Sequence, residues 1–259
     1  MTTSAPPTRI SPDLITSEVR DRVAWILFDG TRPFDGAFWS GLSAELHKAS
    51  ALEIDCVALY GGAANFAVGN NLAWLSAAVG RAARRSGPDT ALLAASKPMR
   101  EAARTLNNCP VVTVAVLAGD VIGAGAELAA LTDLRAATGP LLLALPEPRL
   151  GVIPDIAPPA LLEIVLGASL TRRLLVGGES VHLNAAEADT FIDHWCDSVQ
   201  AVQVRLGERS SYFPRGAVLR ALRRAAWRND QLASAAAMNA ELIGPAAFRA
   251  SLERYAESK

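Results

Sequence analysis

The stretch GDVIGAGAELAALTDLRAA, residues 119–137, takes the chain from a strand through a corner of small residues into a helix. The preceding strand is Val111–Leu117, whose unbroken run of apolar and β-branched residues is typical of a strand buried on both faces. A helix is expected from about Gly123 to Leu131, and further short strands are expected at Asp133–Ala137 and Leu141–Leu145. This alternation of strand and helix predicts parallel strand pairing in an α/β protein.

The spacing of apolar residues elsewhere predicts more strands and helices before this stretch and mainly helix after it. The expected elements are a hairpin of Leu14–Arg20 and Val23–Phe28 that turns at Asp21-Arg22, a helix over Asp35–Ala51, a strand over Ile54–Tyr60, an Ala-rich helical region over Asn71–Leu106 that Gly87-Pro88 interrupts, and helices from Pro159 to the C-terminus. Three parts are predicted: a disordered tail over residues 1–12, an α/β core over residues 13–195 and a helical region over residues 196–259.

Composition limits the classes of partner. The chain has 259 residues, a formal net charge of −1 and 51% hydrophobic residues, so we expect a large core and neither nucleic acid nor a membrane as a partner. Cys56, Cys109 and Cys196 lie far apart without a CxxC pair, so buried free thiols in a reducing compartment are expected rather than zinc or a disulfide. The first residues contain no apolar signal-peptide segment, and a cytoplasmic location is expected.

Two strand-to-helix corners are candidates for chemistry, NFAVGNN over residues 65–71 and the small-residue corner after Val111–Leu117. Small residues let a ligand approach the backbone, and the free N–H groups of a first helical turn favour developing negative charge, so two facing corners would form an oxyanion hole. Two alternatives remain open. The small residues could serve tight packing only, or Gly123-x-Gly125 could begin a dinucleotide loop, although Leu128 replaces its third small residue.

Two glutamates are candidates for acid–base chemistry. Glu127 stands in an apolar helix start, where it is either a surface partner of the helix dipole or a functional acid that faces a pocket. Glu147 stands between Pro146 and Pro148, where it is either an exposed loop acid paired with Arg149 or the second functional acid. Two carboxyl groups in apolar surroundings can divide the acid and base roles, because burial raises a carboxyl pKa towards neutrality.

Four segments resemble the signatures of the crotonase (enoyl-CoA hydratase/isomerase) superfamily. Residues 119–137 are similar to G-x-x-x-G-G-G-x-E-L-A-x-x-C-D-x-R-x-A, and LPEPRLGVIP, residues 145–154, is similar to P-E-x-x-L-G-x-x-P. FAVGNNL, residues 66–72, resembles F-x-A-G-A-D-L, and residues 178–193 follow the pattern G-E…A-x-E-A…G-L-V-D. The four segments occur in the family's order between Val23 and Asp193.

This resemblance implies a spiral of ββα units, followed by a helical region that builds a homotrimer, often paired into a hexamer. It implies an acyl thioester of coenzyme A as the substrate, with no metal and no redox cofactor. The enolate of the thioester would be stabilised by the backbone N–H groups of Asn70 and Ala124, and Glu127 and Glu147 would handle the water and the α-proton. The positions that the resemblance places around substrate and coenzyme A are Ala67, Gly69, Asn71, Gly123 and Asp155.

The chain departs from the family's pattern at three places. Ala124 replaces a usual glycine and Asn71 a usual aspartate, and the sequence DIAPP, residues 155–159, replaces the usual G-x-G-G-T after Pro154. Asp155 is therefore either an N-cap of the following helix or a third carboxylate at the site. These departures favour a specialised acyl-CoA over an ordinary fatty-acyl substrate.

The expected activity is that of an enoyl-CoA hydratase or dehydratase, because both glutamates are present. A double-bond isomerase, a decarboxylase or a hydrolase of the same family is the alternative within enzymes, and a protein that binds acyl-CoA without turnover is the alternative outside them. The C-terminal region from Ala217 to Tyr255 is expected to form the oligomer. Its apolar residues are Leu219, Leu222, Trp227, Leu232, Met238, Leu242, Phe248 and Leu252.

Overall fold

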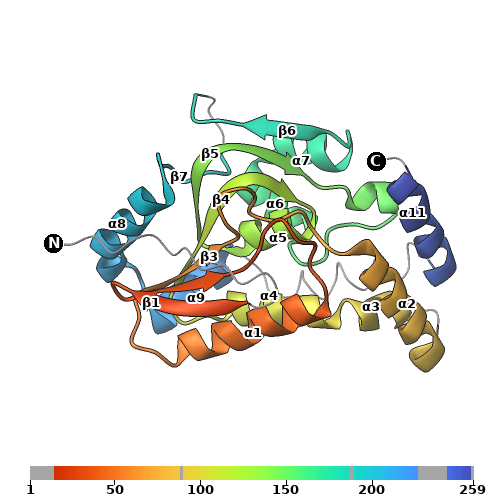
Figure 1. Ribbon diagram of the computed structural model, residues 1–259, viewed down its shortest axis with the longest axis horizontal. Helices are drawn as coiled ribbons and strands as arrows, with labels where there is room; N and C mark the ends of the chain where they lie inside the picture. Colours follow the sequence, from red (N-terminus) through yellow and green to blue (C-terminus); the bar gives the residue numbers. More distant parts are fainter. Residues whose placement is uncertain (1–14, 88–89, 187–189, 227–243, 258–259) are drawn as a thin grey trace.

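The computed structural model describes residues 15–87, 90–186, 190–226 and 244–257 (Figure 1). The strands are β1 (Thr16–Arg20), β2 (Val23–Leu27), β3 (Cys56–Tyr60), β4 (Val112–Ile122), β5 (Leu134–Ala144), β6 (Ser180–Leu183) and β7 (His194–Trp195). The helices are α1 (Gly36–Ser50), α2 (Leu72–Ser86), α3 (Ala91–Ala95), α4 (Lys97–Asn107), α5 (Ala124–Leu131), α6 (Pro159–Leu166), α7 (Ala168–Leu175), α8 (Val199–Arg209), α9 (Gly216–Ala226) and α11 (Pro245–Glu257), with short 3-10 turns η2 (Glu147–Leu150) and η3 (Ser210–Tyr212).

The strands form one mixed sheet in the order β1-β2-β3-β4-β5-β6, and β7 pairs with β5. The pairs from β2 to β5 are parallel, whereas β1 and β6 run antiparallel to their neighbours. The β1–β2 hairpin turns at Asp21 and Arg22, whose φ angles of 48° and 61° are those of a two-residue type I′ turn. The predicted hairpin and the predicted parallel pairing are both confirmed.

Three predicted boundaries are wrong. β4 does not end at Leu117: the register shifts between Leu117 and Gly119, whose φ is +51°, and pairing with β5 continues to Ile122. The two short strands expected over residues 133–145 are one strand, β5, because its second half pairs with this extension of β4. The region after Pro159 is not helical throughout, since β6 and β7 both add to β5.

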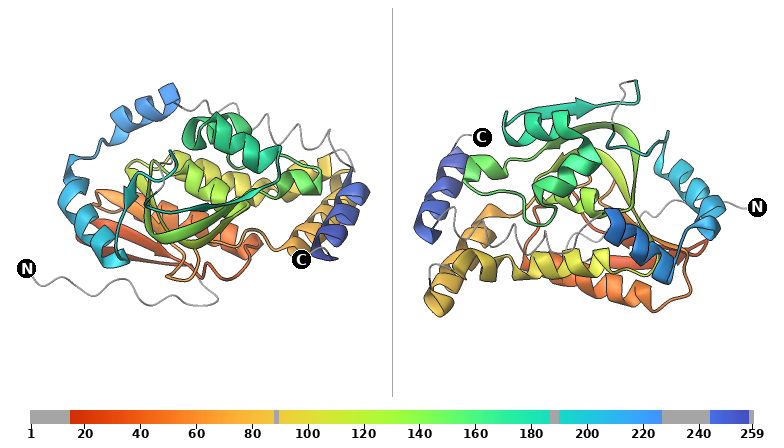
Figure 2. Two further views of the ribbon diagram at one scale, coloured as in Figure 1. Left: turned by 90° about the horizontal axis from the view of Figure 1, so that it is seen from above. Right: turned by 180° about the vertical axis from the view of Figure 1, so that it is seen from behind.

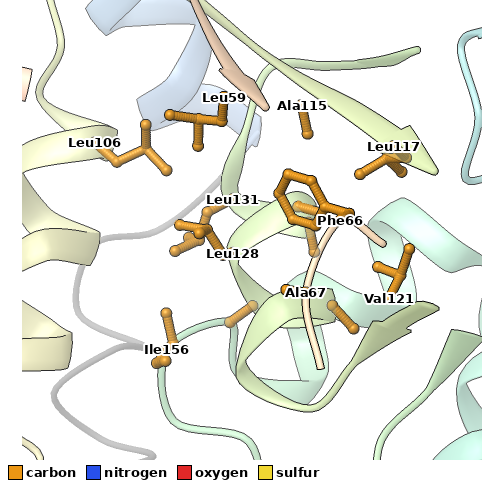
Figure 3. Packing of buried hydrophobic residues seen from close by; sticks show 14 of the residues in the cluster. Leu59, Phe66, Ala67, Leu106, Ala115, Leu117, Val121, Leu128, Leu131 and Ile156 are labelled. Atoms are coloured by element: carbon orange, nitrogen blue, oxygen red, sulfur yellow. The ribbon is translucent and has the colours of Figure 1, made fainter. Parts of the chain in front are cut away.

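The main core lies on one face of the sheet, under α1, α4, α5 and α6. Figure 3 shows the Phe66 ring among Leu59, Leu117, Val121 and Leu128, so the corner after β3 is held by side chains of β3, β4 and α5. A smaller cluster on the other face joins alternate residues of β2, β3 and β4 to α8 and α9. The two strand-to-helix corners are therefore anchored in the best-packed part of the molecule.

Only some of the apolar residues that were expected to form the oligomer are exposed in the C-terminal region. Figure 1 and both views of Figure 2 show α11 beside α2, and Phe248 and Leu252 of α11 are buried there within the subunit. Leu219 of α9 is also buried, whereas the Leu222 side chain is 54% exposed. Trp227, Leu232, Met238 and Leu242 lie outside the described residues, as does the N-terminal tail over residues 1–12. The trimer or hexamer remains a prediction.

Two further observations bear on the sequence analysis. Within the described ranges, no helix combines the length and the apolarity that crossing a bilayer requires. The three cysteines are free; Cys56 and Cys109 are buried, and Cys196 is half-buried. Burial, before any charge effect, raises the pKa of the Cys56 thiol to about 12, so this thiol stays protonated.

A buried arginine fastens α9 to the sheet. The Arg223 guanidinium forms an ion pair with Asp133 and donates to the backbone carbonyls of Asn107 and Cys109 at 2.9 and 2.6 Å. Asp133 accepts in turn from the backbone N–H and the hydroxyl of Thr113 at 2.7 and 2.9 Å. Because both charges are largely withdrawn from solvent, each depends on the other for compensation.

We expect Arg223→Met to lower the free energy of unfolding by about 3–5 kcal/mol, because it leaves the Asp133 carboxylate and several carbonyls without their partner. Arg220 on the same helix is exposed, so Arg220→Met should change it by less than about 0.5 kcal/mol. Urea unfolding followed by circular dichroism measures both variants. Equal stability of the two variants would contradict the role given to Arg223.

Candidate active site

A cavity lies where the corners after β3 and β4 meet η2. Its walls come from α2, the α3–α4 junction, α5, η2, the loop that follows η2, and α11. The empty volume, including the part open to solvent at the mouth, is about 840 Å³. Apolar side chains make up most of the wall, among them Leu72, Leu75, Leu92, Met99, Leu150 and Phe248. The polar residues that line it are Asn70, Ser96, Glu127, Glu147 and Asp155.

The two corners approach each other through glycines. Gly69 has a φ of +88° and Gly123 a φ of +53°, and both values lie in the left-handed region that favours glycine. A Cβ at Gly69 would lie 3.1 Å from the carbonyl oxygen of Ile122, and a Cβ at Gly123 would lie 3.0 Å from Oε1 of Glu147. Side chains at either position would push the corners apart or displace Glu147.

At the first corner, no backbone carbonyl of the described residues accepts from the N–H of Asn70. The residues on either side of Asn70 bond to the backbone of Phe34 at 2.8 Å each, and this parallel bridge turns the N–H between them the other way. The Asn70 side chain is held on both ends: it accepts from Trp39 Nε1 at 3.0 Å and donates to Met99 Sδ at 3.2 Å. These contacts fix the backbone from which the N–H projects.

The second corner presents the N–H of Ala124. Ala124 opens α5, so its N–H is one of the first-turn donors that no carbonyl of the helix can reach. Gly123 donates to the Ala144 carbonyl at 2.8 Å, which ties the start of α5 to β5. Gly125 packs against Ala67, because a Cβ there would lie 2.3 Å from the Ala67 Cβ. The small residues at this corner thus allow tight packing and also leave the N–H of Ala124 accessible from the cavity.

Glu127 is a buried acid, with 2% of its surface exposed, so the alternative of a surface partner for the helix dipole is wrong. Its Oε2 accepts from the backbone N–H groups of Ile156 and Ala157 at 2.8 and 2.9 Å. Burial raises the pKa of Glu127 well above its usual value, and the charges of Glu147 and Asp155 raise it further. The two N–H donors oppose this shift without cancelling it.

Glu147 begins η2 and lies beside Gly123. Its Oε2 is buried and has no hydrogen-bond partner within the ranges that the structure describes. Burial raises the pKa of Glu147 to about 7, and the Asp155 charge adds to the shift. The alternative of an exposed acid paired with Arg149 is wrong, since Arg149 donates to the Gly178 carbonyl instead. Glu147 therefore presents a titratable oxygen that a ligand can satisfy.

Asp155 lines the same cavity from the loop between η2 and α6. Burial raises its pKa to about 6, whereas the Arg100 charge and a hydrogen bond from Ser96 oppose the shift. The N-cap of α6 is Pro158, so the alternative that Asp155 caps this helix is wrong. The structure thus gathers Glu127, Glu147 and Asp155 around one cavity.

Two of the positions assigned to substrate contact lie behind the cavity wall. Ala67 is fully buried under Gly125, and the Asn71 side chain caps α2 by accepting from the Trp74 N–H at 3.0 Å. Gly69 and Gly123 do line the cavity. Ala67 and Asn71 therefore support the backbone of the first corner and do not line the cavity with their side chains.

The sequence motifs did not point to Ser96 at the N-cap of α4, to Met99 and Arg100 within α4, or to Phe248 of α11. Ser96 and Arg100 are four residues apart, so they share a helix face, and this spacing was the available signal. Phe248 gave no signal, because its approach to the cavity depends on the packing of α11 against α2. In the described part of the chain, no three His, Cys, Asp or Glu side chains are arranged to hold a metal ion.

Solved structures with similar folds come from several bacteria. An enoyl-CoA hydratase/isomerase from Xanthobacter autotrophicus Py2 has a TM-score of 0.78 at 21% identity, covering 94% of this chain and 93% of that one. One from Mycobacterium paratuberculosis has a TM-score of 0.77 at 16% identity, covering 94% and 98%. An enoyl-CoA hydratase from Bacillus halodurans has a TM-score of 0.74 at 20% identity, covering 93% and 99%. The fold is therefore the crotonase-type α/β fold.

The sequence identifies the family itself. Residues 32–204 match the profile of the enoyl-CoA hydratase/isomerase family, which is well over half of the chain and includes both corners and all three cavity carboxyls. The protein belongs to the enoyl-CoA hydratase/isomerase family. The resemblance found in the sequence motifs is thereby confirmed at the level of family and fold.

The raised pKa of Glu147 has a consequence for stability. Its usual value is 4.5 and its value in the fold is about 7, so the fold loses stability as pH rises from about 4.5 to 7 and the buried carboxyl ionises. We expect Glu147→Gln to raise the free energy of unfolding at pH 8 by on the order of 1–3 kcal/mol and to leave it nearly unchanged at pH 4.5.

The matched control is Glu163→Gln, which removes an exposed carboxylate from α6. Its effect should be small and equal at both pH values. Thermal and urea unfolding at pH 4.5 and pH 8 measure the difference. A Glu147→Gln effect that does not grow with pH would show that the carboxyl is not held at a raised pKa.

Proposed function

We propose that the protein is an enoyl-CoA hydratase, or in the reverse direction a dehydratase. The observation that carries the proposal is a pair of carboxyls in one cavity beside the open N–H of Ala124: Glu127 is buried, and Glu147 is half-buried with a buried Oε2. Addition of water to a double bond needs one group that takes a proton and one that gives it. A carboxyl pair whose pKa values are both raised by burial holds a proton near neutral pH and suits both tasks.

The proposed oxyanion hole consists of the N–H groups of Asn70 and Ala124. It is supported by the glycine contact that brings the two corners together and by the absence of a backbone acceptor for either N–H within the described residues. The thioester oxygen would accept from both. Fixed donors of this kind act most strongly where charge develops, so they favour the enolate over the neutral thioester.

The reaction then balances without any other reagent. One carboxylate accepts a proton from water, and the water oxygen bonds to the β-carbon of the enoyl group. The electron pair of the double bond moves to form the enolate, whose oxygen the two N–H groups hold. The other carboxyl gives its proton to the α-carbon. One water has been added, nothing has been oxidised or reduced, and no metal or redox cofactor is required.

The other site residues are assigned from a thioester oxygen placed at the N–H groups of Asn70 and Ala124. Gly69 and Gly123 would contact the thioester, and Asp155 would lie along the acyl group, while Ala67 and Asn71 support the two corners from behind. The proposal includes a cytoplasmic homotrimer or hexamer, and the exposed Val218 and Leu222 of α9 are consistent with a subunit contact.

Crotonyl-CoA tests the proposal directly. The absorbance of its enoyl-thioester band should fall when the enzyme adds water, and chromatography should show the 3-hydroxyacyl product. A protein that only binds acyl-CoA would leave the band unchanged, and an isomerase would need a substrate with its double bond elsewhere. Because the DIAPP loop favours a specialised acyl group, branched and functionalised enoyl-CoA thioesters belong in the same assay.

We expect Glu127→Gln and Glu147→Gln each to lower kcat by about 10²–10⁴-fold, the range usual for general acid–base groups. KM should change little, because glutamine keeps the size of glutamate. The double variant should be much less than additively worse, since the two carboxyls act as one unit. An isomerase or a decarboxylase would give a different result, with one variant severely impaired and the other nearly silent.

We expect Ala124→Val to lower kcat/KM by at least about 100-fold, because a β-branched side chain beside the thioester oxygen would remove one oxyanion contact. Ala124→Gly should retain activity. Near-ultraviolet circular dichroism checks that both variants keep their packing, since Ala124 is buried. Full activity of a folded Ala124→Val variant would place the oxyanion hole elsewhere.

A further inference from the structure

The loop between η2 and α6 ties Asp155 to the catalytic pair. The two residues that follow Asp155 are Ile156 and Ala157, and their N–H groups donate to Oε2 of Glu127 at 2.8 and 2.9 Å. Pro154 and Pro158 flank this segment and restrict its backbone. The position of Asp155 relative to Glu127 is thus set by the same two hydrogen bonds that hold Glu127 itself.

Ser96, the N-cap of α4, lines the cavity together with Asp155, and Arg100 lies one turn further along that helix. Burial raises the pKa of Asp155, whereas the Arg100 charge and the Ser96 hydroxyl lower it. Arg100 donates from Nη1 to the Ser96 hydroxyl oxygen at 2.9 Å and from Nη2 to the Leu93 carbonyl at 2.7 Å. The guanidinium is therefore fixed, and its charge favours the Asp155 anion.

We propose that Asp155 is a positioning residue whose anion, held by Ser96 and Arg100, keeps a proton on the Glu127–Glu147 pair at neutral pH. The inference rests on the proposed function only in treating the pair as the acid and base of the reaction. It assigns a task to the α4 residues and to the carboxyl by which this chain departs from the family's usual glycine-rich loop.

The charges around the site support this assignment. The charged groups acting on the three carboxyls are the carboxyls themselves, from α5, η2 and the loop, and Arg100 from α4. Burial and then the Glu147 charge raise the pKa of Glu127, and the Asp155 charge raises it further. Burial raises the pKa of Glu147, a backbone hydrogen bond opposes this shift, and the Asp155 charge adds to it. Burial raises the pKa of Asp155 to about 6, and Arg100 and Ser96 hold it from rising further. Neither of these two residues acts on the pKa of Glu127 or Glu147. The site therefore favours negative charge at Asp155 and disfavours it on the pair.

A bell-shaped pH profile follows from this arrangement. The pair works when it carries one proton, so activity falls at high pH when that proton is lost. The Asp155 anion delays the loss, because removing the last proton would place another negative charge beside it. Below about pH 6 Asp155 becomes protonated, so its influence on the acid limb is smaller.

Asp155→Asn tests the proposal, since asparagine keeps the size of aspartate without its charge. Carboxyl-carbon NMR of protein labelled with [δ-¹³C]glutamate follows the titration of Glu127 and Glu147. The signal that disappears in Glu127→Gln or in Glu147→Gln identifies the resonance of each residue. We expect the raised pKa values to fall by on the order of one unit. The alkaline limb of the kcat profile for the enoyl-CoA substrate should move to lower pH by the same amount, with a smaller change in the acid limb.

The matched control is Glu101→Gln, which removes an exposed carboxylate from the same helix as Ser96 and Arg100 and should change neither titration nor profile. The pair Asp155→Glu and Asp155→Gln keeps the test valid if Asp155→Asn does not fold, because these two side chains differ mainly in charge. The glutamate variant should keep the carboxyl titrations near those of the wild type, and the glutamine variant should not.

The two proposals fail in different ways. Unchanged Glu127 and Glu147 titrations in folded Asp155→Asn would overturn the role of Asp155, whatever the enzyme catalyses. Titrations that fall as expected in a protein without hydration activity would uphold that role and refute the proposed reaction. A kcat profile that shifts without any change in the titrations would also overturn the inference, because Asp155 would then act by another route.

Discussion

The contact between the Gly69 and Gly123 corners is the constraint on which the rest of the site depends. A Cβ at Gly69 would lie 3.1 Å from the Ile122 carbonyl oxygen, so only glycine lets the two backbones meet without displacement. This contact brings the N–H of Asn70 and the N–H of Ala124 to one cavity although more than fifty residues separate them. The geometry of the donors is thus a property of the backbone, and the core beneath Phe66 keeps that backbone in place.

The carboxyls around the same cavity lower the stability of the fold when they ionise. Burial raises the pKa of Glu127, Glu147 and Asp155, so ionising any of them costs stability that the remainder of the molecule must supply. The buried carboxylate that fastens α9 to the sheet, by contrast, has a cationic partner. Asp133 has its own arginine, Arg223, in direct contact, whereas Glu147 has a buried oxygen with no partner among the described residues. The carboxyls with raised pKa values thus gather at the cavity, where the proposed proton transfers would use them, and a compromise between stability and activity of this kind is common.

The sequence predicted those features that depend on neighbouring residues, and it failed where distant segments decide. The apolar run of β4, the small-residue corner and the acid within α5 are local patterns, and each was found where the motif placed it. The full length of β4 was missed because a register shift at Gly119 lets pairing with β5 resume, and only the partner strand reveals this. Phe248 was missed as a cavity residue for the same reason, because it reaches the cavity only through the packing of α11 against α2, which lies far away in the sequence.

The loop after η2 serves the cavity through its backbone and through one of its side chains. The donors to Glu127 are the N–H groups of Ile156 and Ala157, and a backbone N–H places no demand on its own side chain. The loop can therefore carry Asp155 in place of a small residue, provided that Pro154 and Pro158 hold the same path. The added carboxyl needs a compensating group, and α4 supplies it through Ser96 and Arg100. The loop thus brings the Asp155 charge into the cavity and, through the next two backbone N–H groups, also holds Glu127.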